Sequence, residues 1–160
     1  GAEVFVSDSL VKVEFKLEGP DSEWHGVGVE HLWAVQLEPD LFRLDNIPLY
    51  IYEVSLNDVV KAQPGEADGM LVFVEVVSRG GHSTYRIFVE EETDEARFIE
   101  HWQPLEASGC TFERGDERFL AADVPKSADI YAAYELQERG EDEAVWAFEE
   151  GHCGHKLHAR

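Results

Sequence analysis

The chain has 160 residues, and 34 Asp and Glu against 13 Lys and Arg give it a formal net charge of −21 with its seven His neutral. Because a surface this negative repels nucleic-acid phosphates and anionic lipid headgroups, the composition argues against both kinds of partner. The hydrophobic fraction of 44% is sufficient for a packed core, and no apolar run approaches the roughly 20 residues that span a bilayer, so the sequence predicts a compact soluble protein.

The first half of the chain has the pattern of short strands. Apolar and charged residues alternate strictly from Val11 to Glu18, which is the period of a strand with one face in the core. Trp33 begins a second alternating segment, and we expect its side chain to face the core. Turn residues and apolar runs predict the remaining strands. The expected strands are residues 11–18, 33–37, 42–44, 49–54, 71–77 (covered on both faces) and 83–89.

The second half changes to the helical period. Apolar residues recur at helical spacing after Thr93, which is the expected N-cap, and Pro104 predicts a kink or an early end before Gly109. Short strands follow at 111–112 and 119–124. Ser127 is the expected N-cap of a second helix that ends at Gly140, and a last strand spans 145–148.

These elements predict an α+β fold with two halves. Residues 1–82 would form a small β-barrel-like sheet, and residues 83–151 have the strand and helix order βαββαβ of a ferredoxin-like half. Residues 152–160 would be a C-terminal tail that contains His and Cys. Since the strand at 83–89 adjoins both halves, no flexible linker is expected.

Three segments carry a resemblance to a known family. They are Leu44–Pro48 (LDNIP), Val54–Val60 (VSLNDVV) and Trp146–His155 (WAFEEGHCGH). The chain resembles, from about Val11 to His155, a bacterial family known only as a domain of unknown function, number four thousand two hundred and sixty-five. The resemblance implies a bacterial cytosolic protein and brings no activity, substrate or catalytic residue.

The second hypothesis is a metal- or small-molecule-binding module that uses the C-terminal His and Cys segment, and zinc is the one cofactor that the sequence suggests. His152, Cys153, His155 and His158 offer three imidazoles and a thiol within seven residues, and both donor types suit Zn²⁺. A structural zinc site usually takes its ligands from two separated segments, however. The alternative interpretation is a tail whose His and Cys pack against the last strand.

An enzyme is a further alternative, although no catalytic residue is assigned. Cys153 has imidazole neighbours that could activate a thiol, and the pairs Glu149–Glu150 and Asp116–Glu117 could supply an acid and a base. Phosphate loops, nucleophile elbows and HExxH motifs do not occur. With so many acidic residues, such pairs are also expected as solvated surface. Cys110 and Cys153 are expected to be free thiols in a reducing cytoplasm.

The leading hypothesis is an acidic cytoplasmic binding protein, an inhibitor or immunity-type partner of a basic protein. Many acidic groups on a small rigid fold speed encounter with a cationic surface. Trp24 lies in a polar loop at residues 20–26, and with Glu149 and Glu150 it is a candidate partner-binding residue. Packing over the mouth of the barrel is the alternative role for Trp24. Either a monomer or a homodimer is compatible with the sequence.

Overall fold

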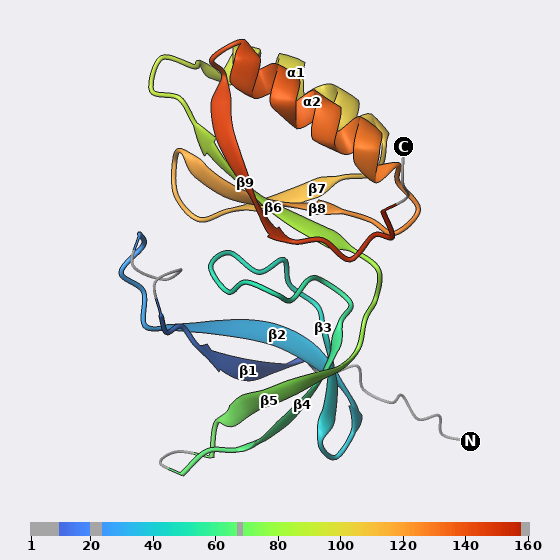
Figure 1. Cartoon of the computed structure of the whole chain (residues 1–160). Helices are drawn as coiled ribbons and strands as arrows, with labels where there is room; N and C mark the ends of the chain where they lie inside the picture. The colour runs from blue at the N-terminus through green and yellow to red at the C-terminus, as the bar shows by residue number, and fades with distance from the viewer. Residues whose placement is uncertain (1–9, 20–23, 67–68, 158–160) are drawn as a thin grey trace, which may run out of the picture.

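The computed structural model describes residues 10–19, 24–66 and 69–157, in which nine strands and two helices occur (Figure 1). The first five strands pair in chain order, and β1 also pairs with β5 in parallel, so that this sheet closes on itself. We call it the closed sheet. Its strands are β1 (Leu10–Lys16), β2 (Val29–Glu38), β3 (Leu41–Leu44), β4 (Val59–Pro64) and β5 (Leu71–Ser78).

Alternating apolar side chains fill the interior of the closed sheet, because successive residues of a strand point to opposite faces. Val13 and Phe15 of β1 are fully buried there, as is Ala34 of β2. Phe15 stacks on Phe73 of β5 with ring centroids 4.6 Å apart. The inward side chains therefore form a core that belongs to this sheet alone.

The second half is a four-stranded antiparallel sheet with two helices on one face (Figure 1). The strands lie in the order β7-β8-β6-β9. A second core lies between this sheet and the helices and includes Trp102 and Trp146. The elements are β6 (Ser83–Val89), α1 (Glu95–Ala107), β7 (Thr111–Arg114), β8 (Phe119–Val124), α2 (Ile130–Asp142) and β9 (Trp146–His152).

The loop between β3 and β4, residues 45–58, lies between the closed sheet and the four-stranded sheet (Figure 1). We call it the junction loop. Strand β6 has side chains on both of its faces buried: Tyr85 and Ile87 belong to the helix-side core, whereas Thr84 and Arg86 contact the junction loop. Strand β6 thus contacts both halves, because its alternate side chains point to opposite faces.

The predicted mixed α+β class is confirmed, but the strand predicted at residues 49–54 was wrong. No strand occurs at 49–54, which lies in the described junction loop, and β4 begins instead at Val59. The sequence there lacks a clean period, and its backbone amides bond to a distant side chain, as described below. Within the described residues, no helix is long and apolar enough to cross a membrane.

Two predictions about strand faces were also wrong. Trp33 is 40% exposed, because β2 directs Leu32 and Ala34 inward and leaves Trp33 on the outer face. There the ammonium group of Lys12 lies 4.9 Å from the centre of its ring. Strand β5 is not covered on both faces, since Val77 is half exposed on the outside of the closed sheet.

The helix boundaries differ from the predictions by a few residues. The N-caps are Asp94 and Asp129 rather than Thr93 and Ser127, and α1 continues through Pro104. Each Asp carboxylate accepts backbone N–H groups of the first turn, which an aspartate at this position does well.

Candidate functional site

The junction loop is held between two buried groups of opposite charge. The Glu30 carboxylate of β2 accepts hydrogen bonds from the backbone N–H groups of Leu49, Tyr50 and Ile51 at 2.7, 3.1 and 2.8 Å. From the other side, the Arg86 guanidinium donates to backbone carbonyl groups of the same loop, at 3.0 Å to Leu49. The loop backbone is therefore fixed by side chains from both halves.

Arg86 is fully buried, and this environment shifts the pKa of its guanidinium. Burial lowers the pKa of the Arg86 guanidinium, while the nearby Glu30 carboxylate raises it. The guanidinium also lies 4.8 Å from the centre of the Tyr52 ring, a cation–π distance. Arg86 thus connects the loop backbone with the aromatic side chain at the edge of the site.

Tyr52 links two of the predicted partner-binding residues. Its hydroxyl donates to the Glu149 carboxylate at 2.7 Å and accepts from the indole N–H of Trp24 at 3.1 Å. Burial and the hydrogen bond to Glu149 raise the pKa of Tyr52, so the hydroxyl remains a neutral donor. The structure therefore places Trp24 and Glu149 in one hydrogen-bonded chain, which the sequence did not indicate.

A cavity of about 410 Å³ opens beside these hydrogen-bonded side chains, between the junction loop and β9. We call it the acidic cavity. Three carboxylates line it, and none of its described lining residues is Lys or Arg. The lining residues are Tyr52, Glu53, Glu149, Glu150, Gly151, His152 and Cys153.

His152 does not offset this negative charge. Its Nδ1 lies 2.9 Å from the Ser55 hydroxyl, which in turn lies 2.6 Å from the Thr84 hydroxyl. Burial lowers the pKa of His152, and the Arg79 guanidinium lowers it further, against the carboxylates nearby. The imidazole is therefore neutral at pH 7 and adds no positive charge to the three glutamates of the acidic cavity.

The predicted zinc ligands lie near one another in sequence but use their donor atoms elsewhere. His155 Nε2 lies 2.9 Å from the Pro125 carbonyl and Nδ1 lies 2.6 Å from the Ser83 hydroxyl, so both ring nitrogens are engaged. The Cys153 thiol lies 3.7 Å from the His155 carbonyl oxygen. His158 is outside the described residues, and within them no three His, Cys, Asp or Glu gather as metal ligands.

The groups considered for catalysis also have other contacts. None of the described hydrogen bonds joins Cys153 to an imidazole: the thiol contacts the His155 carbonyl oxygen, and His152 Nδ1 bonds to the Ser55 hydroxyl. Asp116 accepts the backbone N–H groups of Arg118 and Phe119 and so stabilises the turn between β7 and β8. Glu149 bonds to Tyr52 rather than to Glu150.

Trp24 packs among aromatic rings at the edge of both halves and remains 44% exposed. Its ring lies 5.4 Å from Phe88 and from Phe119, edge to face in both cases. Tyr50 lies 6.0 Å away and stacks on Phe119. Trp24 thus has a packed ring with one accessible face.

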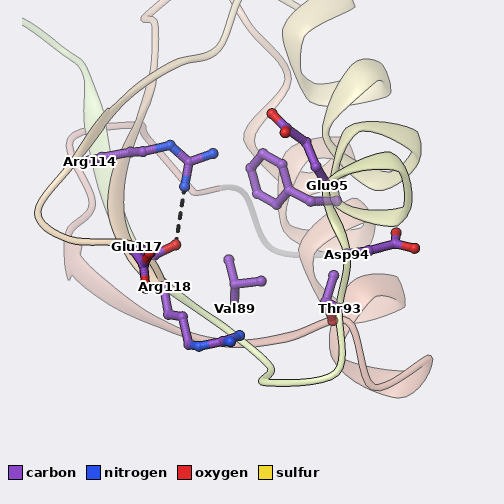
Figure 2. Close-up of a pocket in the computed structure, with 8 residues that line it drawn as sticks. Val89, Thr93, Asp94, Glu95, Arg114, Glu117 and Arg118 are labelled. Atoms are coloured by element: carbon purple, nitrogen blue, oxygen red, sulfur yellow. Dashed lines mark hydrogen bonds between the residues drawn. The ribbon is translucent and has the colours of Figure 1, made fainter.

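Another cavity, of about 420 Å³, lies between the start of α1 and the turn from β7 to β8 (Figure 2). Arg114 and Glu95 lie on opposite sides of it, whereas the Asp94 carboxylate points away from the arginines (Figure 2). Arg114 and Arg118 both donate to backbone carbonyl groups, Arg118 to that of Glu90 at 3.0 Å. Because this cavity has both signs of charge and its arginines are engaged, the acidic cavity is the better candidate site.

Sequence reasoning missed Glu30, Tyr52, Glu53 and Arg86 as parts of the site. Arg86 did leave a signal, because it is the one charged residue of strand β6. Tyr52 and Glu53 left none, since the junction loop has no side-chain period and its path depends on contacts with remote residues.

The two sheets, the buried polar junction and the acidic cavity define an α+β protein with a negatively charged surface site. The chain belongs to the family Domain of unknown function (DUF4265), which matches residues 30–148, and the predicted resemblance is thereby confirmed. A hypothetical protein from Neisseria gonorrhoeae of known crystal structure is similar in fold, with a TM-score of 0.76 and 19% identity over 92% of this chain and 98% of that one. A search of curated proteins finds no match.

Proposed function

We propose that this protein is an acidic cytoplasmic binding protein that docks on a cationic surface of another protein, as an inhibitor or immunity-type partner does. The observation that carries the proposal is the acidic cavity, whose described lining includes three glutamates and no Lys or Arg. A net charge of −21 adds long-range attraction to a basic partner.

Trp24 supports the same surface. Tryptophan, tyrosine and arginine dominate the binding energy of protein interfaces. Trp24 and Tyr52 are hydrogen-bonded to each other and Tyr52 to Glu149, so an aromatic anchor lies beside a carboxylate whose position is fixed. An arginine of the partner could enter the acidic cavity while its neighbours pack on Trp24.

The proposal includes a finer description of the fold. We propose that the closed sheet is a small β-barrel and that residues 83–152 are a ferredoxin-like unit. The parallel pairing of β1 with β5 supports the first assignment, and the order β7-β8-β6-β9 with both helices on one face supports the second. A rigid frame of this kind holds the cavity walls in place.

The test measures binding of a labelled short oligoarginine peptide and of lysozyme, a folded basic protein, by fluorescence anisotropy. The site variant E53Q/E149Q/E150Q removes three charges from the acidic cavity, and the control E90Q/E91Q/E92Q removes three from an exposed segment before α1. We expect the site variant to lose about tenfold or more in affinity and the control about threefold or less.

Trp24→Ala should weaken binding of lysozyme more than binding of the peptide, because a folded partner also packs on the aromatic ring. Equal losses for the two triple variants would overturn the proposal, since they would reflect total charge rather than a site. Failure of the unmodified protein to bind either probe at low salt would overturn it as well.

A further inference from the structure

A further cavity of about 390 Å³ lies between β9 and α2, and it shares Glu150 and Cys153 with the lining of the acidic cavity. We call it the tyrosine cavity. Its described lining includes aromatic, acidic and apolar side chains and no Lys, Arg or His. The residues that the argument uses are Tyr85, Tyr134, Glu135, Glu138, Glu150 and Leu157. We propose that the tyrosine cavity binds a protonated organic amine that has an apolar body, a small-molecule ligand distinct from the protein partner proposed above.

The aromatic rings suit a cation. Tyr85 and Tyr134 have ring centroids 6.5 Å apart with the planes at 59°, and Phe148 lies 5.4 Å from Tyr134, edge to face. Tyr134 is 43% exposed on α2, so its ring is open to a ligand. An ammonium group near such rings is attracted to their negative faces, and the apolar body can pack against Leu157.

The carboxylates supply the opposite charge. Glu135 and Glu138 are three residues apart on α2 and so lie on neighbouring turns of one face, and Glu150 comes from β9. None of the described Lys, Arg or His forms an ion pair with these three. Glu143, just after α2, differs in this respect, because it pairs with Arg139 and His101.

The Tyr85 hydroxyl is a polar group that a ligand in the cavity can reach. Tyr85 is only 2% exposed and lines the cavity, yet among the described residues its hydroxyl forms no hydrogen bond. Among the described residues, the fully enclosed polar atoms without a hydrogen-bond partner are His25 Nε2, Arg86 Nη1 and Gln137 Oε1, so the Tyr85 hydroxyl is open to the cavity, where a ligand N–H group can replace water. Burial raises the pKa of Tyr85, and Glu150 adds to the shift, so the hydroxyl stays neutral. Its oxygen can then accept a hydrogen bond from a donor such as an ammonium N–H.

The negative charges of the lining glutamates also exclude some classes of ligand. A carboxylate or phosphate would be repelled by Glu135, Glu138 and Glu150, and a hydrated inorganic cation would gain little from the tyrosine rings. An amine with an alkyl or aryl body uses all three features of the cavity: the carboxylates, the rings and the Tyr85 hydroxyl.

The test compares two probes of similar size and opposite charge, 2-phenylethylamine and 3-phenylpropionate, titrated into the full chain by calorimetry and by two-dimensional NMR. We expect the amine to bind with one site per chain and to shift the amide signals of α2 and β9, and the acid to do neither. Equal binding of both probes, or no binding of the amine at millimolar concentration, would overturn the proposal.

Tyr85→Phe is the most informative variant, because it removes only a hydroxyl that bonds to no described residue and should leave the thermal midpoint nearly unchanged. We expect it to weaken amine binding about tenfold, the value of one hydrogen bond to a charged group. E135Q/E138Q should weaken it at least as much, whereas the control E91Q/E92Q should change it less than twofold. Unchanged affinity in Tyr85→Phe and in E135Q/E138Q would contradict the proposal, and the protein-partner proposal would be unaffected because Tyr85, Glu135 and Glu138 do not line the acidic cavity.

Discussion

Arg86 lies at the centre of the contacts between the two halves, although its guanidinium reaches backbone carbonyl groups and an aromatic ring rather than a carboxylate. One of its nitrogens, Nη1, is buried and has no described hydrogen-bond partner. The charge is balanced at longer range by Glu30, which holds the opposite side of the same loop. Such a buried charge tolerates little change in its surroundings, because an unpaired ion in the interior is costly.

Gly151 gives a direct test of that crowding. A Cβ added at this position would lie 2.3 Å from Arg86 Nη1, so Gly151→Ala must displace the guanidinium or the β9 backbone. We expect a loss of about 1–3 kcal/mol in the free energy of unfolding, measured with urea. The matched control is Gly28→Ala, where an added Cβ meets nothing within 4 Å. A loss in Gly151→Ala no larger than that of the control would show that Arg86 is not confined as described.

At the scale of single elements, the helices depend on capping residues that the sequence placed slightly wrongly. Asp129 accepts hydrogen bonds from the N–H groups of Tyr131 and Ala132 at 2.9 and 3.3 Å, whereas Ser127 is exposed two residues earlier. Both residue types are good N-caps, so local preference alone could not choose between them. The hydrogen-bond geometry of the turn after Pro125 decides the choice.

We therefore expect Asp129→Ala to lower the free energy of unfolding by about 1 kcal/mol, because α2 loses the acceptor for two N–H groups. Ser127→Ala should change it by less than about 0.5 kcal/mol, as for an ordinary exposed position. Chemical denaturation of the two variants side by side measures both values. A larger loss in Ser127→Ala would restore Ser127 as the cap.

The strands show where local pattern suffices and where it does not. The strict alternation from Val11 to Glu18 matches β1, with Val13 and Phe15 buried as predicted. In β2 most residues around Trp33 are apolar on both faces, so the period did not identify the inner one. The closed sheet buries Leu32 and Ala34, whose smaller side chains fit its narrow interior, and leaves Trp33 outside.

For the whole molecule, polar contacts and the aromatic rings around Trp24, rather than a shared apolar core, connect the halves. The two cores are separate, and Ser55 of the junction loop meets Thr84 of β6 and His152 of β9. Asp58, fully buried, holds this arrangement by accepting from the N–H of Ser55 and from Arg79. We expect the halves to unfold together near neutral pH, because separating them would leave these groups buried without partners.

The same contacts predict a dependence of stability on pH. The pKa of His152 is lower in the folded protein than its ordinary value of 6.5, so the unfolded chain binds more protons below that pH. The free energy of unfolding should therefore fall as the pH is lowered through 6.5, and urea titrations at about pH 7.5 and about pH 5.5 measure the difference.

In His152→Gln the decrease between these two pH values should be smaller, because one group with a lowered pKa is gone. His25, whose pKa is also lowered by burial, keeps part of the effect. His31→Gln is the control, since His31 lies on the outer face of the closed sheet beside Glu14. If His152→Gln and His31→Gln retain the same pH dependence as the unmodified protein, His152 does not link the halves to pH.

The sequence by itself determined the net charge, the mixed α+β class, the family and the burial of residues such as Trp102, because these depend on composition, on local side-chain period and on contiguous motifs. Only the tertiary structure decided that Tyr52 joins Trp24 to Glu149, and that Glu30 and Arg86 hold one loop from opposite sides. Such contacts join residues far apart in the chain, in a loop without a period, so their geometry exists only once both sheets have formed and packed on the loop.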